Sequence, residues 1–155
     1  MNSKEYIPSL ERIEGELENY IHNYLSNCLD FEDFEEQGYE IREGDLLVSV
    51  NINEKEIRTK LDYPLTILKA DSTKRLREFE ILIDSNLEKL IEVSEEVVNS
   101  YSEKPGFVCV TCLEEISKAQ DVEITSAPFS NDYEEAIFFL ITSHENELNW
   151  KFAVE

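Results

Sequence analysis

The sequence predicts an α+β protein in which one antiparallel sheet, or two adjoining ones, carries helices on one face. Apolar residues recur at three- and four-residue steps in some segments, which is typical of amphipathic helices. In other segments they alternate with polar residues, which is typical of half-buried strands. Short polar turns join these strands, so we expect them to pair antiparallel. The predicted order of elements is α-βββ-αα-βββ.

The first predicted helix runs from about Pro8 to Leu29. Pro8 and Ser9 suit its first turn. The acidic segment that follows predicts a short helical turn, which Asp30 caps and Gly38 ends. The apolar stripe of the first helix comprises Leu10, Ile13, Leu17, Tyr20, Ile21, Tyr24, Leu25 and Cys28.

A period of two defines the first three predicted strands, which run over residues 46–52, 57–67 and 79–83. A short turn at residues 53–55 joins the first two, which predicts a hairpin. Pro64 has no N–H to donate to a ladder. Its strand is therefore expected to lie at an edge or to be bulged there.

Two helices are predicted next. Residues 85–88 have the S-x-x-E pattern of a capping box, and an apolar stripe then extends to Tyr101. The Lys-Pro-Gly sequence at residues 104–106 breaks the chain. A second stripe over residues 107–119 predicts the following helix.

The C-terminal part returns to the strand pattern. Strands are predicted over residues 122–127, 133–142 and 148–154, with a hairpin turn at residues 144–147. The middle strand is continuously apolar. That pattern predicts a central strand that is buried on both faces.

The composition limits the class of protein. A chain of 155 residues fits one domain, residues 1–155, and is long enough to build a hydrophobic core. Its 14 basic and 35 acidic residues give a net charge of −21, so nucleic-acid binding, which needs a basic patch, is not expected. No apolar run approaches the ~18 residues of a membrane span. We therefore expect an acidic, soluble domain.

The strongest chemical signal is the C-x-x-C sequence formed by Cys109 and Cys112 at a predicted helix start. Residues three apart on a helical turn lie about 5–6 Å from each other, which is within disulfide range. A helix N-terminus favours a reactive thiolate, whereas Glu103, Glu114 and Glu115 disfavour one. A structural disulfide, a pair of buried thiols, a redox pair and a metal site are all compatible with the pattern.

Cys28 lies on the stripe of the first helix, so all three cysteines are expected to point inward. A bridge from Cys28 to Cys109 or Cys112 would close a loop of about 80 residues and stabilise the fold by ~4 kcal/mol. A zinc site that adds a histidine to the three cysteines has one paired spacing, where a convincing site has two. His22 is expected on a helix surface and His144 in a turn.

Other candidate sites carry weaker signals. The acidic run of residues 30–36 lacks the alternating ligands and central Gly of an EF-hand loop. We expect it to be a solvated cap with Phe31 and Phe34 turned inward. No Gly-rich phosphate loop and no nucleophile–His–acid motif is present. The sequence therefore predicts no catalytic residue, no bound metal and no cofactor.

Three stretches match a known family: Leu17–Ile41 (LENYIHNYLSNCLDFEDFEEQGYEI), Lys60–Thr73 (KLDYPLTILKADST) and Pro105–Leu113 (PGFVCVTCL). Together they resemble anchored cell-surface proteins of small-genome (DPANN-type) archaea, a family without an assigned function. Full-length members of that family carry an N-terminal hydrophobic anchor reminiscent of pilins, then a further extracytoplasmic region, then a domain like this one. The resemblance implies that this chain is a soluble fragment from outside the cell, where disulfides are expected. Cys28, Cys109 and Cys112 stand at the family's cysteine positions.

The predicted function is that of a non-catalytic extracytoplasmic domain that serves attachment, assembly or the binding of a protein or surface partner. The acidic composition, the lack of catalytic motifs and the family resemblance favour it. One alternative is a thiol–disulfide or metal-binding protein that uses Cys109 and Cys112. Another is a small-ligand binder or enzyme with a cavity between a curved sheet and its helices, by analogy with cystatin-like and nuclear-transport-factor-like folds.

Overall fold

The computed structural model describes residues 7–102, 107–130 and 135–154. The chain divides into two compact units: residues 10–52 and 57–83 form the N-terminal unit, and residues 1–9, 53–56 and 84–155 form the C-terminal unit. The first part of the chain contains α1 (Leu10–Cys28), α2 (Glu32–Glu36), β1 (Glu40–Glu43), β2 (Leu47–Ile52), β3 (Glu56–Lys69) and β4 (Ser72–Asp84). The second part contains α3 (Leu87–Ser102), α4 (Val110–Gln120), β5 (Val122–Ser130), β6 (Glu135–Ser143) and β7 (Asn149–Val154).

The predicted α+β class and the antiparallel pairing are confirmed. The strand β1 was not predicted. Ile41 is its single apolar residue, so the sequence shows no alternation there. It is a strand because it pairs with β3, with Glu40 opposite Leu68 and Glu43 opposite Leu65. If residues 1–155 form one domain, the two units unfold together in one transition. That they do so stays a prediction.

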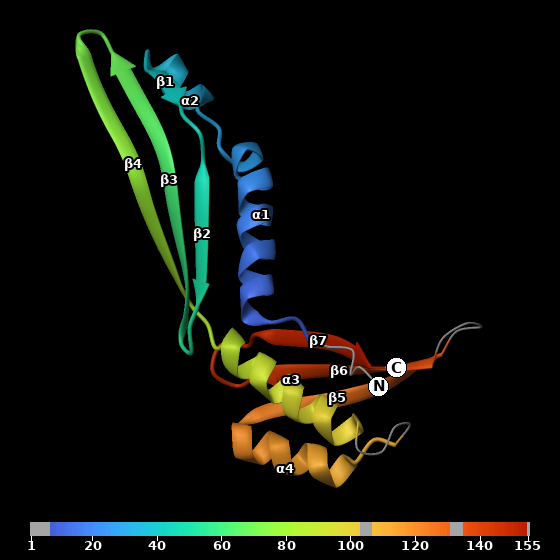
Figure 1. Ribbon diagram of the computed structural model, residues 1–155. Helices are drawn as coiled ribbons and strands as arrows, with labels where there is room; N and C mark the ends of the chain where they lie inside the picture. The colour runs from blue at the N-terminus through green and yellow to red at the C-terminus, as the bar shows by residue number, and fades with distance from the viewer. Residues whose placement is uncertain (1–6, 103–106, 131–134, 155) are drawn as a thin grey trace. The chain divides into compact units, whose positions relative to one another are not determined.

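In the N-terminal unit, β3 lies at the centre of a four-stranded sheet. β4 pairs with one edge of β3, and β1 and β2 follow one another along the other edge (Figure 1). The ladder is interrupted at residues 44–46, opposite Tyr63 and Pro64. The carbonyl of Pro64 accepts the N–H of Gly44 at 2.7 Å, so the missing N–H of Pro64 faces the same edge. Of the two predicted alternatives, an edge position is wrong because β3 is the central strand, and a bulge at Pro64 agrees with the three residues that stand opposite two at this point.

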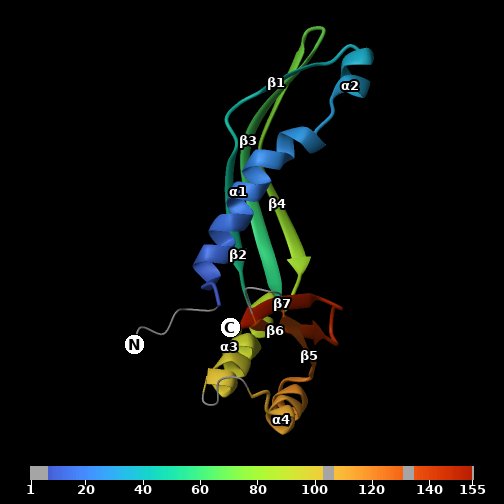
Figure 2. The ribbon, with the colours of Figure 1, turned by 90° about the vertical axis from the view of Figure 1, so that its right-hand side faces the viewer.

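The helix α1 lies along β2 in both ribbon views (Figures 1 and 2). It begins two residues after Pro8 and ends at Cys28, close to the predicted bounds. Ile13 is its most deeply buried side chain, and Val50 and Ile52 of β2 are buried as well. The apolar face of α1 is therefore covered by the sheet of its own unit.

Two glutamates of α1 bind the backbone of β2. The carboxylate of Glu18 accepts the Val50 N–H at 2.9 Å, and that of Glu14 accepts the Ile52 N–H at 2.7 Å. Four residues of helix rise about 6 Å, and two residues of strand rise about 6.6 Å, so the two spacings match. These donors point away from β3. The glutamates therefore satisfy an edge of β2 that no further strand of the described chain pairs with.

In the C-terminal unit, β6 is the central strand of a sheet with the order β5-β6-β7. The helices α3 and α4 cover one face of it (Figure 1). Leu90, Val93, Val97 and Leu113 of the helices pack with Val122, Phe139, Ile141 and Val154 of the strands to form the core. These residues all belong to the C-terminal unit, whereas Ile13, Val50 and Ile52 are buried in the N-terminal unit.

The central position of β6 is confirmed, but its predicted burial on both faces is wrong. Phe139 is 1% exposed, whereas its neighbour Phe138 is 37% exposed. Phe139 faces the helices, and Phe138 faces the opposite side of the sheet. Within this unit the described helices pack on only one side, so alternate residues of an entirely apolar strand meet different surroundings.

The capping box predicted at the start of α3 takes a different form. The helix begins at Leu87, and the hydroxyl of Ser85 accepts the Leu87 N–H at 3.2 Å. The buried side chain of Asn86 donates to the hydroxyl of Ser143 at 2.6 Å. This pair joins the start of α3 to the end of β6. No helix in the described ranges is both long enough and apolar enough to cross a membrane.

Candidate functional site

Cys109 and Cys112 form a disulfide, with their Cα atoms 5.2 Å apart. Cys109 is the N-cap residue of α4, and its sulfur accepts the Cys112 N–H at 3.3 Å. One turn further on, Leu113 inserts into the core beside Phe139 and Val154. The predicted position of the C-x-x-C sequence at a helix start is confirmed. Of the pairings that the sequence left open, the structure forms the one within this motif.

Both disulfide cysteines are half-buried, and exposed side chains lie next to them in the chain. Val110, between them, is exposed, and so is Phe107 just before them. Glu114 and Glu115 are exposed on the next turn of α4. The disulfide is therefore accessible to a small reductant, but it lies at a surface rather than in an enclosed site.

Cys28 is a free, exposed thiol at the end of α1, so the prediction that all three cysteines point inward is wrong. The apolar stripe that the sequence predicted for this helix includes residues from two neighbouring rows on its surface, and only one of these rows is covered. Tyr20, Tyr24 and Cys28 follow one another at four-residue steps and are all exposed, while Ile21 and Leu25 are half-buried. The rings of Tyr20 and Tyr24 are in contact, with centroids 4.7 Å apart and an angle of 34° between their planes. The exposed row is therefore an aromatic strip that ends in a thiol.

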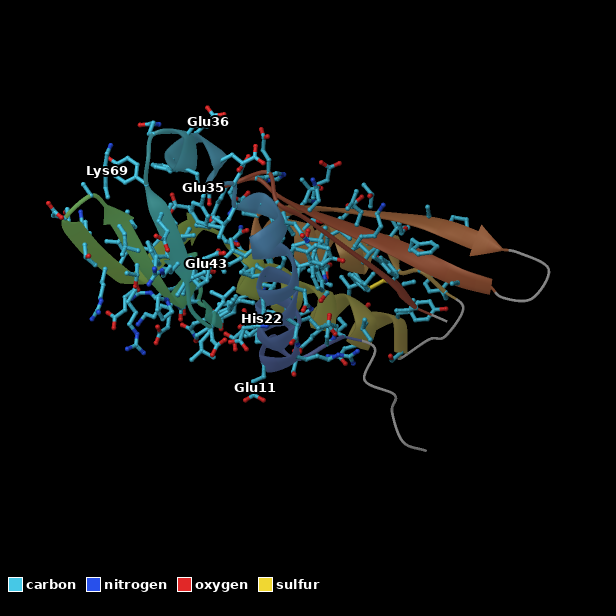
Figure 3. All side chains as sticks on the ribbon, turned by 90° about the horizontal axis from the view of Figure 1, so that it is seen from above. Glu11, His22, Glu35, Glu36, Glu43 and Lys69 are labelled. Carbon is cyan, nitrogen blue, oxygen red and sulfur yellow. A yellow bond between two sulfur atoms is a disulfide. The ribbon has the colours of Figure 1, made fainter. Side chains whose placement is uncertain are left out.

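The histidines lie where the sequence predicted them. His22 is exposed on α1 (Figure 3). His144 lies in the turn after β6, with its Nδ1 3.2 Å from a carboxylate oxygen of Asp121. Across the described ranges no three Cys, His, Asp or Glu side chains come together as metal ligands do.

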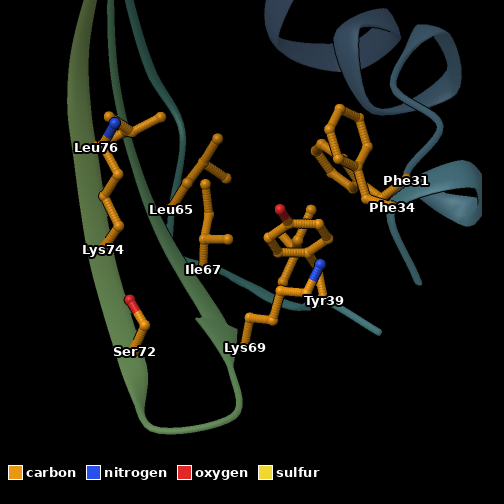
Figure 4. A pocket seen from close by; sticks show the side chains of 10 residues that line it. Phe31, Phe34, Tyr39, Leu65, Ile67, Lys69, Ser72, Lys74 and Leu76 are labelled. Carbon is orange, nitrogen blue, oxygen red and sulfur yellow. The ribbon is translucent and has the colours of Figure 1, made fainter. Parts of the chain in front are cut away.

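A hollow of about 480 Å³ lies in the N-terminal unit between the α2 segment and the β3–β4 hairpin (Figure 4). Phe31 and Phe34 form one wall. Leu65 and Ile67 of β3 and Leu76 of β4 form the opposite wall. Because Phe34 is 49% exposed, the hollow opens to solvent. The prediction that both phenylalanines turn inward is therefore wrong for Phe34.

Local geometry explains how the short helix α2 presents its rings. A side-chain oxygen of Asp30 accepts the Glu32 N–H at 2.9 Å and starts the turn. Gly38, at a φ of 84°, ends it, and its N–H donates to the Glu35 carbonyl at 2.8 Å. The predicted role of Gly38 is confirmed. The predicted cap is displaced by one residue, because Phe31 is the N-cap of α2 and Asp30 binds the Glu32 N–H from the position before it. The carboxylates of the run, including Glu36, lie on the surface of α2 (Figure 3).

The polar part of the hollow is basic. Lys69 and Lys74 line it together with Ser72, and its lining contains no carboxylate. The ammonium group of Lys69 lies 3.9 Å from the centre of the Tyr39 ring, which is a cation–π contact. The hollow therefore combines an apolar floor with cationic groups, in a chain whose net charge is −21.

Sequence reasoning missed this hollow. Phe31 and Phe34 were placed on an acidic turn, and Leu65 and Ile67 on a strand. Their meeting depends on how the two segments pack. The sequence signal that pointed to it was the cluster of basic residues at the β3–β4 turn, among them Lys69 and Lys74.

No protein-family model matches the chain, and no curated protein or solved structure is significantly similar to it. Function is therefore inferred below from the chemistry of the residues themselves.

Proposed function

We propose that this chain is a non-catalytic interaction or structural domain that works outside the cytoplasm, as the soluble part of an anchored cell-surface protein like those of DPANN-type archaea. The observation that carries the proposal is the disulfide between Cys109 and Cys112. Disulfides persist in oxidising compartments and are rare in the reducing cytosol. The family resemblance of the sequence favours the same location.

The position of the disulfide favours a structural role. Cys109 caps α4, and the bond to Cys112 fixes the first turn of that helix. The same turn leads directly to Leu113 in the core of the unit. The bond therefore restrains the start of a helix that leads into the core, which is the kind of task that structural disulfides perform.

The interaction part of the proposal is supported by large apolar side chains at the surface. Tyr20 and Tyr24 form an exposed pair of contacting rings on α1, at 62% and 52% exposure. Ile81 and Ile83 share one face of β4 and are 49% and 54% exposed. Contiguous exposed apolar groups are typical of surfaces that bind a partner.

The free thiol of Cys28 provides a test of location. Intact cells that carry the full-length protein are treated with a membrane-impermeant maleimide, and the protein is then analysed by peptide mass. We expect one label, at Cys28, and labels at Cys109 and Cys112 only after reduction. Labelling of Cys28 only after cell lysis would contradict the extracytoplasmic location. A Cys28→Ser variant controls for labelling at other sites.

A second candidate is a thiol–disulfide protein, which is favoured by the half-buried disulfide at a helix N-terminus. The two candidates predict different reduction potentials. A structural disulfide is expected below about −300 mV, and a redox-active one between about −270 and −120 mV. Equilibration with glutathione or dithiothreitol buffers, followed by alkylation and mass analysis, measures the value. A potential in the higher range would replace the structural interpretation with the redox one.

A further inference from the structure

We propose that the hollow between α2 and the β3–β4 hairpin is a binding site for a small amphiphile, a molecule with one apolar chain and an anionic head group. This proposal is independent of the location of the protein and of the role of its disulfide. It rests on the shape, the lining and the charge of the hollow.

The shape fits a small ligand rather than a water molecule. A volume of about 480 Å³ lies within the range of roughly 300–1,000 Å³ that is usual for small-molecule sites. The rings of Phe31 and Phe34 face the aliphatic side chains of Leu65 and Ile67 across the opening (Figure 4). An apolar chain inserted there would contact both walls.

The lining is apolar although it is open to water. Phe34 and Leu76 are 49% and 37% exposed. In the folded protein these side chains leave apolar area in contact with solvent, and removing such area from water is favourable. An apolar ligand would supply the cover that the chain itself does not supply there in the described residues.

The charges in the hollow select the head group. Among the described residues neither Lys69 nor Lys74 forms an ion pair with a carboxylate. Lys69 is held over the Tyr39 ring, so its ammonium group stays at the hollow. A cationic head group would be repelled by both lysines, whereas a carboxylate, sulfate or phosphate would be attracted by both.

The net charge of −21 opposes anions at long range, but screening limits that effect. At physiological ionic strength the Debye length is about 8 Å. An anion within hydrogen-bond distance of the lysines therefore responds mainly to them. We expect binding to be observed at about 0.15 M salt and to be weaker at low salt, where distant carboxylates are less screened.

Calorimetric titration of the whole chain with three ten-carbon probes tests the proposal: decanoate, decanol and decyltrimethylammonium, each below its micelle concentration. Decanoate is expected to bind at least tenfold more tightly than the cationic probe. In a Lys69→Gln/Lys74→Gln variant, decanoate affinity is expected to fall at least tenfold while decanol affinity is unchanged. A Lys60→Gln/Lys118→Gln variant removes the same charge away from the hollow and should bind decanoate like the wild type.

Three outcomes would overturn the proposal. The first is equal affinity for the anionic and cationic probes, and the second is loss of decanoate binding in the control variant alone. The third is the absence of decanoate binding together with binding of an acidic, hydrophobic peptide, which would make the occupant a polypeptide. Because Lys69 and Lys74 are exposed, their variants are expected to fold, and an unchanged unfolding midpoint confirms this. A Phe34→Glu variant provides an independent test, since an added carboxylate in the wall should abolish decanoate binding.

Discussion

At the scale of single residues, the N-terminal unit depends on glutamates that bind backbone groups. Glu14 and Glu18 accept the N–H groups of Ile52 and Val50, which no strand pairs with in the described chain. The sequence offered 35 acidic residues and nothing that set these two apart. Their role follows only from the match between the rise of α1 and that of β2.

We expect Glu14→Ala and Glu18→Ala each to lower the free energy of unfolding by about 1–3 kcal/mol, because the backbone N–H of a buried residue loses its acceptor. Glu14→Gln and Glu18→Gln keep an acceptor oxygen and are expected to lose less than half as much. Urea unfolding measures the differences. Equal losses for the Ala and Gln variants would contradict a role as hydrogen-bond acceptor and favour one for the charge.

Tyr63 makes stability depend on alkaline pH. Burial, and then its hydrogen bond and proximity to the Glu43 carboxylate, raise the pKa of Tyr63 to about 12. In the unfolded chain a tyrosine has a pKa near 10. The folded state therefore holds this proton more tightly, and the stabilisation is complete below about pH 10 and is lost as the pH rises towards about 12.

A Tyr63→Phe variant has no phenol proton to lose, so we expect it to lack the loss of stability that the wild type shows at alkaline pH because of Tyr63. Unfolding midpoints of the wild type and the variant should differ at pH 9 and converge as the pH approaches 11.5. Tyr20→Phe, which changes an exposed ring of the same unit, is the matched control and should stay parallel to the wild type. If the unfolding midpoints of Tyr63→Phe and the wild type differ by a constant amount across this range, the pKa of Tyr63 is not raised in the folded state.

At the scale of elements, two glycines have opposite roles. Gly44 lies at the interruption between β1 and β2, where an added Cβ would approach the Cβ of Pro64 to 3.0 Å. Gly15 lies inside α1, and an added Cβ would have no atom within 4 Å. Gly44 permits the close approach of its segment to Pro64 of β3, whereas Gly15 only weakens α1.

We expect Gly44→Ala to destabilise the protein by about 1–3 kcal/mol because the strands must shift. Gly15→Ala should stabilise it by about 0.5–1 kcal/mol because alanine favours a helix interior. Thermal unfolding of the two variants compares the effects directly. A stabilising Gly44→Ala would show that the interruption at Pro64 has room to relax.

The periodicity of apolar residues in the sequence predicted most of the helices and strands, but not all of them. It identified α1, α3, α4 and every described strand except β1. In most of these elements an apolar face is buried, whereas in β4 the alternation is present but Ile81 and Ile83 are exposed. The periodicity missed β1, which has no apolar alternation, and it made the stripe of α1 too wide. Tyr20, Tyr24 and Cys28 look like core residues in the sequence. They are exposed because β2 and its neighbours cover only the adjacent row of the helix.

At the scale of the whole molecule, the net charge of −21 is expected to be the main electrostatic effect on stability. Excess charge of one sign opposes the compact state by self-repulsion, and salt screens it. The ion pairs are mostly exposed, and exposed pairs add little to the free energy of unfolding. Screening these attractive pairs with salt therefore lowers stability only slightly. We expect the unfolding midpoint to rise between low salt and about 0.5 M salt. A midpoint that falls over this interval would contradict the dominance of repulsion.

The same experiment tests the prediction of one domain. The single tryptophan, Trp150, lies in the C-terminal unit, and a fluorophore on Cys28 would report on the N-terminal unit. Coincident transitions are expected if residues 1–155 unfold as one domain. Two separate midpoints would show that the units unfold independently.

The sequence by itself determined the class of the fold, the antiparallel pairing, the irregularity at Pro64 and the helix start at the C-x-x-C motif. These features depend on local periodicity, on proline chemistry and on turns, all of which act between near neighbours in the chain. Tertiary structure alone decided which row of α1 is exposed, how Glu14 and Glu18 bind β2, and that a basic apolar hollow forms beside α2. Each of these depends on segments that are distant in the sequence, and the contact between them is fixed by packing rather than by any one segment.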